Sequence, residues 1–120
     1  MKKLTDKEEE VMQFLWDNGP LFVREILEFY PDPKPHYNTV STVIRVLEEK
    51  KFVDHKTYGN TYQYFAAISQ EEYKGKALKK VVSQYFDNSY TNVVSTLIEE
   101  ERLSITELKK LIKKIEKGKK

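Results

Sequence analysis

The sequence predicts a mostly α-helical protein with one small β-hairpin, an α+β fold built in two parts. Apolar side chains recur at helical spacing in several separate segments. One pair of β-rich runs flanks Gly59 and Asn60, and no strand pattern follows residue 68. We therefore expect two domains: residues 1–68, which contain the hairpin, and residues 69–120, which contain helices alone.

Composition limits the classes of protein to consider. The chain has 120 residues, 33% of them charged and 12% aromatic, as expected of a globular protein rather than a disordered one. Without cysteine it can form neither disulfides nor Cys-based zinc or iron–sulfur sites. The first ten residues, MKKLTDKEEE, lack the apolar run of a signal peptide, and no segment approaches the roughly 20 apolar residues of a membrane span. We expect a cytoplasmic protein without membrane insertion.

The first helix is predicted to begin after Thr5, which forms a capping-box pattern with Glu8. Its apolar stripe consists of Val11, Met12, Leu15 and Trp16. Asn18-Gly19-Pro20 ends this helix. A short extended segment over 20–22 and a second helix over 23–30 are expected next. The sequence PDPKP at 31–35 then forms a loop that no helix can cross.

A third helix is predicted over residues 36–50, and the hairpin follows it. The buried stripe of this helix consists of Val40, Val43, Ile44 and Leu47. The hairpin runs at 52–58 and 61–67 are rich in β-branched and aromatic residues, and Gly59-Asn60 between them suits a two-residue turn. The order helix, short strand, helix, helix, hairpin is that of a winged helix-turn-helix.

Three further helices are predicted after the hairpin, over 69–86, 90–101 and 104–117. Capping-box patterns open the first and last of them, with Ser69 and Ser104 each followed three residues later by a glutamate. The segment DNS at 87–89 separates the first from the second.

The polar face of the third helix carries short hydrogen-bonding side chains. Asn38, Thr39, Ser41 and Thr42 are not strong helix formers, and Arg45 shares their side of the helix. No acidic residue occurs from residue 33 to residue 47. A helix that enters the major groove needs short donors and acceptors near base edges and no carboxylates there. The open alternative is an ordinary amphipathic helix whose polar face meets water.

The hairpin favours the DNA-binding interpretation. Lys56, with Lys50, Lys51 and His55 before it, forms a basic cluster at its base. Tyr58 and Tyr62 flank the turn. For at least half of the tyrosines in the hairpin, packing on the sheet is a better explanation than contact with DNA. The predicted DNA-binding residues are Asn38, Thr39, Ser41, Thr42, Arg45, Lys56, Asn60 and Thr61.

The charge balance leaves a second interpretation open. Residues 1–68 hold 9 basic and 11 acidic side chains, a net charge of −2, whereas residues 69–120 hold 12 and 8, a net charge of +4. The half that resembles a DNA-binding domain is therefore net acidic. A winged helix used only for protein–protein contact would explain this acidity, but not the stretch without acids at 33–47.

The last three helices carry more apolar surface than they can cover by themselves. The final helix has an apolar stripe at near-heptad spacing, and 52 residues are too few to bury all these faces. We expect a homodimer, although the helices could instead fold back on the winged helix of their own chain. The predicted interface residues are Tyr90, Val94, Leu97, Ile98, Leu108, Leu111, Ile112 and Ile115.

Catalytic, metal and cofactor sites are not expected. The sequence contains neither a nucleophile–base set nor a phosphate-binding glycine motif. His36 and His55 lack metal-ligand spacing with other candidate ligands.

Four segments together resemble the penicillinase repressor family, the BlaI/MecI/CopY type: LTDKEEEVMQFLWDNGP, YNTVSTVIRVLEEKKFVDHK, GNTYQYFAAIS and VVSTLIEEERLSITELKKLIKKI. They occur in the family's order and cover nearly the whole chain. The resemblance implies a bacterial transcriptional repressor that binds a dyad operator in double-stranded DNA as a homodimer. It also implies that the family's recognition-helix contacts fall on Asn38, Thr39, Ser41 and Thr42, with Arg45 matching less securely.

The sequence departs from the family in two places. Some members sense copper through C-terminal cysteines, which this chain lacks. In the members that respond to β-lactams, an Asn-Phe bond in the second-last helix is cut to release the repressor. That bond falls on Thr96-Leu97 here, so the apolar residue is kept and the asparagine is missing. An adjacent gene for a membrane sensor-protease would imply this kind of release here. Whether this bond is cut stays open, as do the operator, the regulated genes and the inducing signal.

Overall fold

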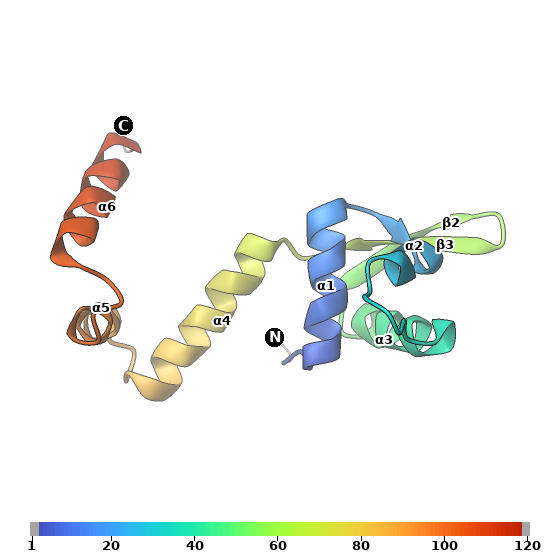
Figure 1. Ribbon diagram of the computed structural model, residues 1–120, viewed down its shortest axis with the longest axis horizontal. Coiled ribbons are helices and arrows are strands. Elements are labelled where there is room, and N and C mark those ends of the chain that lie inside the picture. The colour runs from blue at the N-terminus through green and yellow to red at the C-terminus, as the bar shows by residue number, and fades with distance from the viewer. Residues whose placement is uncertain (1–2, 119–120) are drawn as a thin grey trace. The chain divides into compact units, whose positions relative to one another are not determined.

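The computed structural model describes residues 3–118, and the chain forms two compact units whose boundary falls between Lys74 and Gly75. The predicted α+β class is confirmed, with a small antiparallel sheet among helices (Figure 1). The elements are α1 (Asp6–Asn18), β1 (Leu21–Phe22), α2 (Val23–Glu28), α3 (Tyr37–Glu49), β2 (Val53–Tyr58), β3 (Thr61–Ala66), α4 (Gln70–Tyr85), α5 (Tyr90–Glu99) and α6 (Ile105–Gly118).

The sheet has the order β1-β3-β2, and both of its pairs are antiparallel. Strands β2 and β3 form the predicted hairpin, with Val53 opposite Ala66 and Tyr58 opposite Thr61. Gly59 has a φ of +58° in the turn, a backbone conformation that glycine adopts without steric cost. The short segment after α1 is a true third strand, because Leu21 pairs with Tyr64.

The core of the N-terminal unit lies where α1, α2 and α3 meet this sheet. Met12, Leu15, Ile26, Ile44 and Leu47 are among its fully buried side chains. The first turn of α4 belongs to the same unit, because the Tyr73 ring lies against the rings of Trp16 and Phe52. These contacts explain why the boundary between the units falls within α4, a few residues after its start.

Helix α2 is shorter than predicted and ends at Glu28 rather than at Tyr30. The amides of Phe29 and Tyr30 donate to the carbonyls of Ile26 and Leu27, which makes a tighter turn than an α-helix. The ammonium group of Lys34 caps this end of the helix, because it donates hydrogen bonds to the carbonyl oxygens of Leu27, Glu28 and Tyr30. Pro31 also lacks the amide that a longer helix would need.

A buried ion pair joins the start of α1 to the end of α3. The Lys50 Nζ lies 2.7 Å from the Oε1 atom of Glu8, whose side chain is almost fully buried. The same oxygen accepts from the Thr5 amide at 2.8 Å, so the predicted capping box is present. Burial alone would raise the pKa of Glu8, but the hydrogen bonds and charge of Lys50 and the bonds from Thr5 hold that pKa below its usual range.

Replacing Glu8 by glutamine should destabilise the protein by about 2 kcal/mol at pH 7, because Lys50 loses its partner while the capping box can persist. The pKa of Glu8 is lowered in the folded state, so its stabilising contribution is present above the pKa of the unfolded chain and is lost as the pH falls through the folded value. Urea unfolding of both proteins between neutral and acid pH should show the gap in unfolding free energy closing as the pH falls.

The matched control is Glu28→Gln, which removes an exposed carboxylate and should change stability by less than about 0.5 kcal/mol. A Glu8→Gln protein as stable as the wild type at pH 7 would contradict this account of the pair.

The C-terminal unit consists of the rest of α4 together with α5 and α6. Helix α6 begins at the predicted capping box of Ser104 and Glu107. Helix α5 begins at Ser89, in the segment predicted to separate two helices, and the Ser89 hydroxyl accepts from the Asn92 amide. Within residues 75–118, Val82 is the one buried hydrophobic side chain. None of the described helices combines the length and apolar character that crossing a bilayer requires.

Candidate nucleic-acid interface

Helix α3 has a buried face and a polar face, as predicted. Val40, Ile44 and Leu47 are at most 1% exposed and anchor the helix in the core. On the opposite side Asn38, Thr39, Thr42 and Arg45 are exposed and Ser41 is half-buried. The first turn carries no acidic side chain. The anchoring of α3 therefore does not depend on its polar residues.

Two basic residues near the start of α3 have structural roles that the sequence did not suggest. The Nδ1 atom of His36 accepts a hydrogen bond from the Asn38 amide at 3.1 Å, so His36 is the N-cap of the helix. Lys34 is held by the carbonyl end of α2. His36 and Lys34 therefore stabilise the ends of α3 and α2.

Hydrogen bonds within α3 hold two of the candidate side chains close to the helix. The Thr42 hydroxyl donates to the Asn38 carbonyl at 2.8 Å, and the Nε atom of Arg45 donates to the Ser41 carbonyl at 3.3 Å. At the hairpin tip the Thr61 hydroxyl donates to the Tyr58 carbonyl at 2.9 Å. In the free protein these donors are satisfied locally.

A cavity of about 490 Å³ separates α3 from the tip of the hairpin. Ser41 and Arg45 from α3 and Asn60 and Thr61 from the hairpin line it, so four of the predicted residues meet at one surface. Asn38, Thr39, Thr42 and Lys56 are exposed outside this lining.

The cavity also includes residues that the sequence analysis missed. Arg24 and Glu25 from α2 and Tyr37 from the first turn of α3 all contribute to its wall. Tyr64 contributes to the wall as well, and burial together with the negative charge of Glu48 raises the pKa of its hydroxyl. Arg24 sits at the start of an amphipathic helix without a basic neighbour in sequence, so no local pattern distinguished it.

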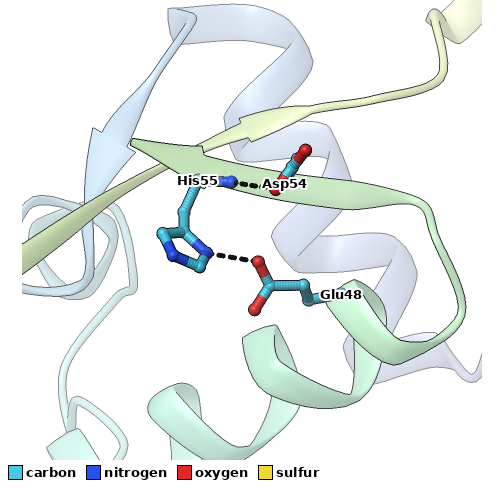
Figure 2. A group of neighbouring side chains, drawn as sticks. All are labelled: Glu48, Asp54 and His55. Atoms are coloured by element: carbon cyan, nitrogen blue, oxygen red, sulfur yellow. Dashed lines mark hydrogen bonds and ion pairs between the residues drawn. The ribbon is translucent and has the colours of Figure 1, made fainter. Parts of the chain in front are cut away.

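Two of the four residues in the basic cluster predicted at the base of the hairpin are bonded to acidic side chains. Lys50 is paired with Glu8, and the His55 ring is bonded to the carboxylate of Glu48 (Figure 2). Lys51 and Lys56 are exposed. The two pairs join residues from different elements, which explains why the run of basic residues in the sequence does not form one patch.

The hairpin tyrosines pack on neighbouring rings, as the sequence analysis favoured, yet remain about half exposed. The Tyr58 ring meets that of Phe22 edge to face at 5.9 Å, and the Tyr62 ring lies 4.2 Å from the His55 ring. Tyr62 also lines the cavity beside α3.

The residues predicted for a dimer interface lie on α5 and α6. Tyr90, Leu97, Leu111, Ile112 and Ile115 are exposed. Val94, Ile98 and Leu108 are half-buried. Thr96 and Leu97, which flank the candidate cleavage bond, lie in the last turns of α5, where their carbonyls accept from the amides of residues 100 and 102.

Comparison with known proteins agrees with this architecture. A sequence model described as "Penicillinase repressor" matches residues 4–117. The methicillin resistance regulatory protein MecI of Staphylococcus aureus (strain N315) is 26% identical over 112 residues, which cover 91% of this chain and 89% of the relative. The protein of the same name from Mammaliicoccus sciuri shows the same identity and coverage.

The family match spans nearly the whole chain and includes both units. Members of this family are transcriptional regulators and not enzymes. The chain belongs to the penicillinase repressor family.

Proposed function

We propose that this repressor binds a palindromic operator in double-stranded DNA as a homodimer, through α3 and the β2–β3 wing. The observation that carries the proposal is the surface shared by Ser41, Arg45, Asn60 and Thr61. Short polar groups on α3 match the base edges of a major groove, and the tip of the wing can follow the adjacent backbone. Arg24 from α2 adds a cation that suits a phosphate at the same surface.

A second copy of the chain is the partner we propose for the C-terminal unit. A unit with one buried hydrophobic side chain within residues 75–118 has too small a core to be stable alone. Leu111, Ile112 and Ile115 leave an apolar stripe on α6 that is about half exposed. A two-fold dimer through α5 and α6 would cover this stripe and give two copies of α3 about one DNA turn apart, or a simple multiple of it.

Release from DNA by proteolysis at Thr96-Leu97 is a further part of the proposal, with a membrane sensor-protease as the partner that starts it. Leu97 is exposed and supplies the apolar residue after the bond. Both residues are helical, so a protease would need the end of α5 to open first. Cleavage there would separate α6 from the rest of the chain and remove part of the proposed dimer interface.

Binding of the wild-type protein to a dyad duplex tests the main proposal. We expect a dimer to bind a palindrome from the DNA beside its own gene at least about a thousandfold more tightly than a scrambled duplex. The logarithm of the binding constant should fall linearly with the logarithm of salt concentration, by about 0.9 for each phosphate contacted. Fluorescence anisotropy at several salt concentrations measures both quantities.

The same experiment separates this function from that of a winged helix that contacts only proteins. Such a module would bind dyad and scrambled duplexes equally weakly. That result would reject the operator-binding proposal, and it would leave the family membership and the fold unchanged.

A further inference from the structure

A mixed set of nitrogen and oxygen ligands converges where α3 meets the hairpin. Glu48 lies in the last turn of α3, and Asp54 and His55 lie near the start of β2 (Figure 2). One ligand atom from each of the three side chains lies within 4.8 Å of the other two. Within residues 3–118 this is the one such group of three. From the sequence no metal ligand is expected at His55, because it lacks metal-ligand spacing with other candidate ligands.

Neighbouring groups hold the imidazole and one carboxylate in fixed orientations. The backbone amide of His55 donates to Oδ1 of Asp54 at 2.8 Å, which holds this carboxylate against the main chain of β2 next to the histidine. The Nδ1 atom of His55 bonds to Oε2 of Glu48. The rings of Tyr62 and Tyr64 lie 4.2 Å and 5.6 Å from the His55 ring, on the same hairpin. The ring therefore needs little ordering before it can bind a ligand.

We propose that Glu48, Asp54 and His55 form a binding site for one divalent transition-metal ion of the Zn²⁺ class. An imidazole with two carboxylates suits such ions, whereas Mg²⁺ and Ca²⁺ prefer oxygen ligands alone. Tetrahedral Zn²⁺ sites place neighbouring ligand atoms about 3.4 Å apart, as follows from metal–ligand distances near 2.1 Å. The three ligand atoms, which lie within 4.8 Å of one another, would have to move closer by side-chain rotation to reach this spacing, and water would supply the fourth ligand.

The ion would replace the hydrogen bond between His55 and Glu48 with two metal–ligand bonds. Glu48 and Asp54 provide two negative charges to balance a divalent cation, and both side chains keep contact with solvent, so the ion has a path of entry. Bound metal would join the end of α3 to the start of β2. The N-terminal unit should therefore unfold at a higher temperature when the ion is present.

Metal titration of the full-length protein, first treated with a chelator, tests the site without any DNA. We expect Co²⁺ to bind in a one-to-one ratio with a visible absorption spectrum, and Zn²⁺ to displace it and raise the melting temperature. His55→Ala should abolish binding, and Asp54→Asn should weaken it at least about tenfold. Because the chain has no cysteine and only two histidines, the spectrum can be assigned without ambiguity from thiolates.

Matched controls are available for each ligand type. His36→Asn removes the other histidine and keeps a good N-cap for α3, and Glu49→Gln removes the acid next to Glu48. Both should bind metal like the wild type. Should His55→Ala melt at a much lower temperature than the wild type without metal, the Asp54→Asn protein decides the question.

Two results would overturn the proposal: no saturable Co²⁺ or Zn²⁺ binding up to about 1 mM metal, or binding that survives in both His55→Ala and Asp54→Asn. A preference for Mg²⁺ over Zn²⁺ would likewise reject the stated class of ion. Because these measurements need no operator, their failure is distinct from a failure of DNA binding.

Discussion

Replacing Leu111 by aspartate is expected to convert the proposed dimer into a monomer and to weaken binding to the proposed operator by about a hundredfold or more. Leu111 lies on the apolar stripe of α6, where it is 48% exposed within one chain. A two-fold interface contains each residue twice, so one substitution introduces two carboxylates into an apolar contact. A monomer also loses the second half-site, and with it the gain in affinity that linked binding provides.

Analytical ultracentrifugation and anisotropy with the dyad duplex measure the two effects. The control is Lys110→Asp, which adds aspartate one residue away on the polar side of α6 and should leave the dimer intact. The single tryptophan, whose indole nitrogen donates to the Ile68 carbonyl, reports whether the N-terminal unit stays folded. A Leu111→Asp protein that sediments as a dimer would refute α6 as the interface.

The local features of the fold were predictable from the sequence because they depend on neighbours within one turn. The Thr5–Glu8 and Ser104–Glu107 capping boxes require only residues three apart, and both are present. The hairpin turn at Gly59 is equally local. The burial of Val40 and Ile44 followed from the period of the helix alone.

The contacts of the basic residues could not be predicted, because their partners are distant in the sequence. Lys50 pairs with Glu8 across 42 positions, and His55 meets Glu48 only because β2 returns beside the end of α3. A run of basic residues can therefore be interpreted as a DNA-binding patch only when the acidic side chains near it in the folded structure are known. Arg24 was missed for the converse reason, since tertiary contacts bring it to the cavity beside α3.

These pairs also bear on the acidity of the N-terminal half. Glu8 neutralises Lys50 inside the fold, and Glu48 lies in the last turn of α3, where its carboxylate is bonded to His55. The net charge of a domain thus describes its surface poorly when several acids are engaged internally. What matters for DNA is that α3 itself carries no acidic residue on the exposed face formed by Asn38, Thr42 and Arg45. Glu25, which lines the cavity beside this face, accepts a hydrogen bond from the Phe22 amide.

The double substitution of Ser41 and Thr42 by alanine should reduce the preference for operator over random DNA by about 2 kcal/mol or more, close to thirtyfold. Each lost base contact is worth roughly 1–3 kcal/mol of discrimination. The Thr42 hydroxyl donates within the helix in the free protein, so binding would exchange one hydrogen bond for another. The loss should therefore appear in the choice between sequences more than in the affinity for random DNA.

The stability of the double variant should increase slightly or stay the same. This result would separate a role in contacting DNA from a role in folding. Thr42 is exposed, and alanine is the better helix former at such a position. Glu49→Ala, on the same helix but at its C-terminal end, should keep the full preference for the operator. Fluorescence anisotropy with the operator and with a random duplex measures the preference, and thermal melting of each protein measures its stability. If the double variant discriminated as well as the wild type, the exposed polar face of α3 would not be the surface that recognises the operator.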